Sequence, residues 1–112
     1  MDERRYLELA EKALARIVSA FDEIELDAAD VDSSGDVVTI TFGLAAKAAG
    51  RRVVVNTQRP ARQIWLAGGD RAWHFSYDEA SARWMDDRAT GAELFATVRA
   101  VCADAGVPAV QP

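Results

Sequence analysis

The spacing of the apolar residues changes twice along the chain, and this restricts the possible folds more than any other feature of the sequence. Between Tyr6 and Phe21, apolar residues recur every three or four positions, which is typical of an amphipathic helix. From Val37 to Asp86 they alternate in short runs, which is typical of strands with one buried face. After Thr90 the helical spacing returns. The sequence therefore predicts one helix, a series of short antiparallel strands and a second helix, which is an α+β order.

Local signals place the ends of these elements. Asp2 is the predicted N-cap of the first helix, and the run from Thr90 to Glu93 matches the capping-box pattern that opens the second. Gly106 and Pro108 are expected to end that helix and leave a frayed tail. The expected strands cover residues 37–42, 52–56, 63–66, 73–77 and 83–86.

These elements predict a single domain over residues 1–112 with two layers. Two helices cannot cover both faces of a sheet, so we expect both to pack on one face and leave the other open to solvent. In the run 63–66, Ile64 and Leu66 form the natural buried pair, and alternation then places Gln63 and Trp65 on the open face.

Composition excludes several classes of protein. One cysteine and one histidine leave no material for a disulfide framework, a multi-cysteine metal site or a two-histidine protease motif. A net charge of −5 argues against nucleic acid as the main partner. No apolar run approaches the ~20 residues of a membrane span, and the polar residues 1–5 do not resemble a signal peptide, so we expect a cytoplasmic protein.

An acidic segment lies between residues 22 and 36, and no lysine or arginine occurs between Arg16 and Lys47. Its members are Asp22, Glu23, Glu25, Asp27, Asp30, Asp32 and Asp36. Crowded carboxylates repel one another, and their oxygens are hard ligands suited to iron, manganese, calcium or magnesium. Because the spacing does not match an EF-hand loop, we expect a shallow and weak metal surface. The alternative is a solvated segment that only keeps the protein soluble.

Trp65 is the second candidate feature. A tryptophan on an open sheet face indicates an interface, and Asn56 and Gln58 are expected to share that face. The alternative is an indole folded onto a neighbour such as Arg62. His74 is also expected to point outward, either as a metal ligand, as part of the Trp65 surface or as a solvated residue.

Two further features concern Cys102 and the arginines. Cys102 lies on the apolar stripe of the second helix and is expected to be buried. Five arginines in the middle of the chain should oppose the acidic segment and give the molecule a charge dipole suited to oriented docking. They are Arg51, Arg52, Arg59, Arg62 and Arg71.

The run from Val53 to Pro60 (VVVNTQRP) and the run from Gln63 to Leu66 (QIWL) resemble the central signature of the frataxin family, most closely its bacterial branch. The resemblance extends from Tyr6 to Gly106. It implies a two-layer sandwich with the terminal helices on one face of an antiparallel sheet. It also implies weak iron binding, as Fe²⁺ or Fe³⁺, by Asp22, Glu23, Glu25, Asp27, Asp30 and Asp32. The partner-binding residues that it implies are Asn56, Gln58, Gln63 and Trp65.

Members of that family associate with the cysteine desulfurase and the scaffold protein of iron–sulfur cluster assembly, so the resemblance implies a modulator of that process. Two departures bear on docking and iron binding. The segment Gly43–Gly50 is longer than the expected turn, and Ser19 and Ala20 occupy positions that are commonly acidic.

Three hypotheses follow. The first is a monomeric, non-enzymatic iron-binding regulator of cluster assembly. The second is an adaptor whose carboxylates contact a basic partner without metal. The third is a ferroxidase, which the sequence disfavours because it has no Glu-x-x-His pair for a di-iron site.

Overall fold

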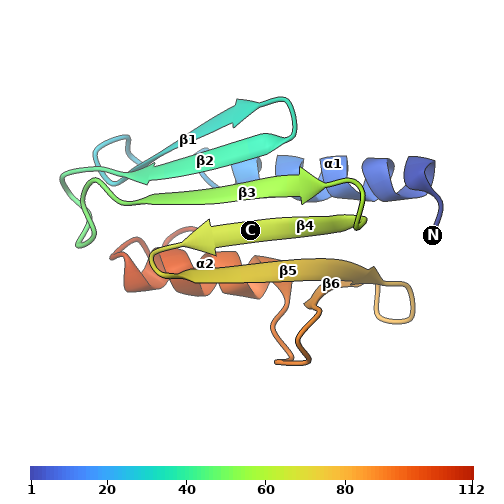
Figure 1. Ribbon diagram of the computed structural model, residues 1–112. Helices are drawn as coiled ribbons and strands as arrows, with labels where there is room; N and C mark the ends of the chain where they lie inside the picture. Colours follow the sequence, from blue (N-terminus) through green and yellow to red (C-terminus); the bar gives the residue numbers. More distant parts are fainter.

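Two helices lie on the same face of a six-stranded antiparallel sheet, as the sequence predicts (Figure 1). The structure is a computed structural model that describes every residue from Met1 to Pro112. In chain order the elements are α1 (Glu3–Ser19), β1 (Ala29–Ser34), β2 (Val37–Phe42), β3 (Arg52–Gln58), β4 (Gln63–Gly68), β5 (Arg71–Asp78), β6 (Arg83–Asp86) and α2 (Leu94–Asp104). The strands lie side by side in that same order, with β1 and β6 at the two edges.

The core fills the space between the sheet and the helices. Val38 and Ile40 of β2, Val55 of β3 and Ile64 and Leu66 of β4 are each fully buried. The burial of Ile64 and Leu66 confirms the predicted inward face of that strand. The outward residues between them form the open face, which no helix covers. Figure 1 shows α1 behind the β1–β3 half of the sheet and α2 behind the other half.

The first helix begins where its cap predicts. Asp2 has an extended backbone, and its carboxylate accepts a hydrogen bond from the Arg5 amide at 2.8 Å. On the buried stripe of α1, Tyr6 reaches the sheet, where its hydroxyl donates to the Gln63 carbonyl at 2.6 Å. This bond fastens α1 to the strand that carries Trp65.

One strand of the sheet was not expected from the sequence. The acidic run Ala29–Ser34 forms β1, which pairs with β2 along its whole length. Its alternation is hidden because only Ala29 and Val31 are apolar, and they face inward opposite Phe42 and Ile40. The carboxylates of β1 therefore lie on an edge strand rather than in a loop, and charged edge strands resist pairing with other chains.

The second helix begins later than the capping box predicts. Its N-cap is Glu93, whose carboxylate accepts from the amides of Phe95 and Ala96 at 2.9 and 3.0 Å. Thr90 instead donates to Asp86 at 2.7 Å, so its hydroxyl serves the end of β6. Gly91 has a φ of 80°, which prevents a helix from running through this position.

The chain after α2 is packed rather than frayed. Val107 and Val110 are buried in the same core as the strands, because the tail folds back against the helices. The long segment after β2 also packs there: Ala46 is buried, and the Ala48 amide donates to the Ala105 carbonyl at 3.1 Å. The extra residues of 43–50 therefore cover the end of α2 and do not lengthen a hairpin.

Candidate functional site

The predicted partner-binding residues meet on the open face of the sheet. Asn56 of β3 lies opposite Trp65 of β4, and Gln58 lies opposite Gln63 two pairs further along the same two strands, on the same face. We call these four residues the amide–tryptophan patch. All four side chains are half-buried, so the sheet holds them at the surface without sealing them inside.

The indole of Trp65 is held by one stacking contact and one hydrogen bond. Its ring stacks on the imidazole of His74 with centroids 4.1 Å apart and planes 14° from parallel. Its Nε1 donates to Gln63 Oε1 at 2.9 Å. The indole does lie against a neighbouring side chain, as one alternative expected, but that side chain is His74 of the adjacent strand and not Arg62.

Gln63 extends this network beyond the residues that the sequence indicated. Its Nε2 donates to Asp87 Oδ2 at 2.9 Å and to Ser76 Oγ at 3.1 Å. His74 Nδ1 lies 3.9 Å from the same Asp87 oxygen. Sequence analysis missed Asp87 because it follows the last strand, where alternation no longer indicates a face. The expectation that His74 joins the Trp65 surface is confirmed.

The acidic segment divides into two parts. The turns between α1 and β1 contain Asp22, Glu23, Glu25 and Asp27. Asp30 and Asp32 instead point outward from β1, opposite Thr41 and Thr39. All six are exposed, and none takes part in a salt bridge of the molecule.

The seventh acidic residue behaves differently. Asp36 accepts a hydrogen bond from the Thr57 hydroxyl, which ties it to β3. It is therefore occupied by the protein itself, unlike the other six.

The carboxylates do not form a ready-made metal cage. No three histidine, cysteine or acidic side chains are grouped so that they could hold a metal ion. Asp30 and Asp32 share the open face with Trp65, three strands away, which corresponds to roughly 14 Å across the sheet at the usual strand spacing. The register places Trp65 level with Ser34, so Asp32 and Asp30 are also displaced by two and four residues along the strands. The arrangement is thus an anionic edge beside a flat, hydrogen-bonded indole, suited to contact with another molecule's surface.

Cys102 has the inert environment that was expected. It is fully buried on α2, and burial raises the pKa of its thiol to about 12. A thiol with that pKa remains protonated near neutral pH and is a poor nucleophile or metal ligand.

The similarity of this chain to known proteins shows which family it belongs to. The model of the frataxin-like domain matches residues 1–106. The chain belongs to the frataxin-like family. Two curated relatives carry the name iron-sulfur cluster assembly protein CyaY. The one from Pseudomonas fluorescens is 38% identical over 88 residues, which are 79% of this chain and 74% of that protein. The one from Stutzerimonas stutzeri is 31% identical over 111 residues, which are 99% of this chain and 94% of that protein.

A solved structure agrees with this assignment. The frataxin of Psychromonas ingrahamii superposes on this frataxin-like protein with a TM-score of 0.74, covering 89% of this chain and 87% of the other, at 26% sequence identity. The resemblance read from the strand motifs is thereby confirmed. None of the helices of this chain has the length and apolar character needed to cross a membrane.

Proposed function

We propose that this frataxin-like protein takes part in iron–sulfur cluster assembly, where it binds iron weakly through surface carboxylates and docks on the cysteine desulfurase and its scaffold partner. One observation carries the proposal: six exposed carboxylates without ion-pair partners lie on β1 and in the turns before it, and a half-buried, hydrogen-bonded indole lies on the open face of the same sheet. The names of the relatives support the same process. The protein acts as a regulator or assistant in this proposal, without catalysis of its own.

The carboxylates supply the ionic part of the surface. Since no guanidinium of the chain neutralises Asp22, Glu23, Glu25, Asp27, Asp30 or Asp32, each is available to a cation or to a basic partner. Carboxylate oxygens are hard donors that suit Fe²⁺ and Fe³⁺, and exposed ligands without a cage give low affinity.

Trp65 supplies the apolar part. Tryptophan is enriched among the residues that dominate binding energies, and an indole already held in place loses little conformational entropy when a partner covers it. Asn56, Gln58 and Gln63 surround it with amide groups that can exchange hydrogen bonds across an interface.

Calorimetric titration of the desulfurase–scaffold complex with this protein tests the docking role. We expect Trp65→Arg to weaken binding at least about tenfold, because the indole is lost and a charge enters the centre of the surface. Ala15→Arg, on the exposed side of α1, adds the same charge away from the surface and should bind like the wild type. Equal affinity of Trp65→Arg and the wild type would refute the docking assignment.

The absence of a grouped triad of ligands favours one alternative, an adaptor whose carboxylates contact a basic partner without metal. The same titration separates the two. If iron takes part, a chelator reduces affinity at constant ionic strength. If the adaptor hypothesis is correct, affinity falls steeply with salt and does not respond to the chelator.

A further inference from the structure

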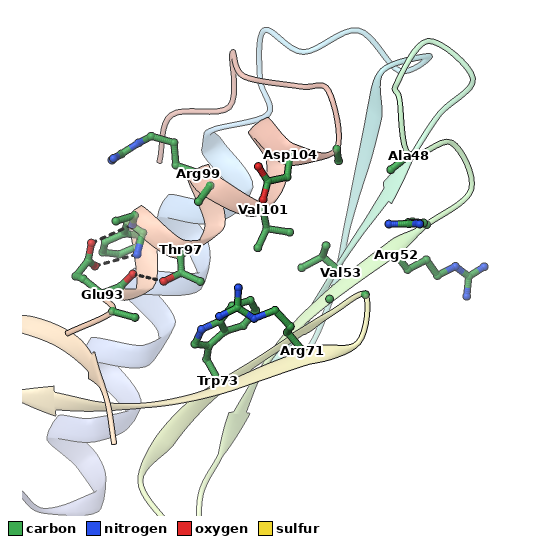
Figure 2. Close-up of a pocket in the computed structure, with 18 of the residues that line it drawn as sticks. Ala48, Arg52, Val53, Arg71, Trp73, Glu93, Thr97, Arg99, Val101 and Asp104 are labelled. Carbon is green, nitrogen blue, oxygen red and sulfur yellow. Dashed lines mark hydrogen bonds between the residues drawn. The ribbon is translucent and has the colours of Figure 1, made fainter. Parts of the chain in front are cut away.

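A groove with a strongly basic lining runs along α2 on the helix side of the molecule, away from the face described above. Its volume is about 980 Å³, near the upper end for ligand sites, and a second hollow of about 660 Å³ adjoins it at Arg71 and Trp73. Trp73, Val53 and Val101 contribute apolar atoms. Figure 2 shows Arg71 lying across Trp73 below Val101 of α2.

The charge of this groove opposes that of the whole protein. The chain has 13 basic and 18 acidic residues. Seven arginines line the two hollows, against only three acidic residues, Asp70, Glu93 and Asp104. The arginines are Arg16, Arg51, Arg52, Arg71, Arg83, Arg88 and Arg99. One of the acids, Glu93, is occupied by the N-terminal amides of α2.

Most of these arginines lack the carboxylate partners that other arginines have, although Arg16 donates to the Pro112 carbonyl at 3.1 Å and lies over the Phe95 ring. Arg4, Arg5 and Arg59, outside the groove, are each paired with a glutamate within 3.4 Å or less. Around the groove only Arg88 comes near a carboxylate, 4.0 Å from buried Asp86. A set of guanidinium groups without internal counter-charges is prepared for an external anion.

The strand pairing of β5 beside the groove is also incomplete on the β6 side. β6 pairs only with Phe75–Asp78, so the half of β5 from Arg71 to Trp73 is paired with β4 on one side and has no strand on the other. One carbonyl of this edge, that of Ala72, accepts from Arg88 Nη2 at 2.6 Å. The next carbonyl along this edge, that of His74, accepts from the Asp87 amide at 2.9 Å, so recognition at the groove depends on its lining side chains more than on free backbone groups.

We infer that this groove binds an extended acidic peptide segment of a partner protein. The positive charges are spread over α1, the start of β3, β5, β6, the turn after β6 and α2, so they fit a series of carboxylates better than one small anion. The apolar floor accepts an aliphatic side chain between the carboxylates. A nucleic acid fits less well, because its long backbone would meet the negative charge of the rest of the surface.

Fluorescence anisotropy with a short labelled peptide of alternating glutamate and leucine tests the inference. We expect the wild type to bind it, and Arg83→Glu combined with Arg99→Glu to weaken binding about tenfold. Both side chains are exposed and make no internal hydrogen bond or ion pair, so the fold should persist. Arg4→Glu combined with Lys12→Glu makes the same change of total charge on the exposed side of α1 and should leave affinity within about twofold.

Amide shift mapping of the wild type gives a second measurement that needs no variant. Peptide should shift the signals of Arg71–Trp73 and of exposed α2 residues, and leave those of Asn56 and Trp65 unchanged. Three results would overturn the inference: no binding, equal weakening in both double variants, or displacement of the peptide by an equal concentration of inorganic phosphate or single-stranded DNA. Because neither double variant changes the amide–tryptophan patch or the acidic segment, failure here leaves the proposed function untouched.

Discussion

At the scale of single residues, Gln63 joins the interior of the protein to its candidate surface. Its backbone carbonyl accepts from Tyr6 of α1 at 2.6 Å, while its side chain accepts from Trp65 and donates to Ser76 and Asp87. Every polar atom of that amide therefore has a partner, which fixes its orientation and with it the indole. A partner that covers Trp65 meets a surface that is already ordered.

Cys102 offers a residue-scale prediction about pH. Burial raises the pKa of its thiol from 9.0 to about 12, so the folded protein keeps a proton that the unfolded chain releases above pH 9. The thiol therefore does not affect the unfolding free energy below its pKa in the unfolded chain, and it lowers the unfolding free energy as pH rises from 9 toward 12. Between pH 8 and pH 10 the wild type should lose about 1 kcal/mol more unfolding free energy than Cys102→Ala.

Urea unfolding at the two pH values measures this difference. The cavity that Cys102→Ala creates lowers its stability equally at both, and ionisation of Tyr6 and other groups is common to the two proteins, so only the thiol remains in the comparison. Parallel pH dependences for wild type and variant would show that the thiol does not titrate as described.

At the scale of elements, the turn between β5 and β6 contains Ala82 with a φ of 55°, in the left-handed region that costs a residue with a Cβ about 1 kcal/mol. We expect Ala82→Gly to raise the unfolding free energy by about 0.5 kcal/mol. The variant loses the backbone strain of the folded state, and the greater conformational entropy of glycine in the unfolded chain offsets part of that gain. Ala80→Gly in the same turn, where φ is not positive, should lower it. Urea titrations followed by far-UV circular dichroism decide the order, and an Ala82→Gly protein no more stable than Ala80→Gly would contradict the strain.

The elements also show what periodicity can and cannot predict. Strands with three alternating apolar residues, such as Val38, Ile40 and Phe42, were predicted with their register. β1 was missed because only two of its residues, Ala29 and Val31, are apolar and face inward. Two residues are too few to show alternation within an acidic segment. The tail was missed because Val107 and Val110 lie in no repeating pattern, and burial of single residues depends on contacts distant in sequence.

For the candidate site too, the sequence predicted which face each residue lies on but not the contacts between strands. Alternation placed Gln63, Trp65 and His74 on the open face, since that inference needs only the strand itself. The stacking of His74 on Trp65 and the bond from Gln63 to Asp87 depend on which strands are neighbours. The basic groove was not predicted, because Arg71, Arg83, Arg88 and Arg99 come from separate segments that only the fold brings together.

At the scale of the whole molecule, charge is separated between two regions. The unpaired carboxylates gather along β1 and the turns before it, whereas seven of the 13 basic residues line the hollows beside α2. Of the five arginines expected to oppose the acidic segment, Arg51, Arg52 and Arg71 line the hollows, whereas Arg59 is paired with Glu3 and Arg62 lines neither hollow. Such a molecule is oriented by a partner's field before contact is made.

The central claim is that the acidic segment is a weak iron surface beside the amide–tryptophan patch. Anaerobic titration of ¹⁵N-labelled protein with Fe²⁺ tests it most directly, with Asp30→Asn/Asp32→Asn as the variant and Glu8→Gln/Glu11→Gln on α1 as its charge-matched control. Amide signals between Asp22 and Asp36 should broaden first in the wild type and in the control, and less at β1 in the variant. Broadening spread evenly over the surface, or none at all, would contradict the claim.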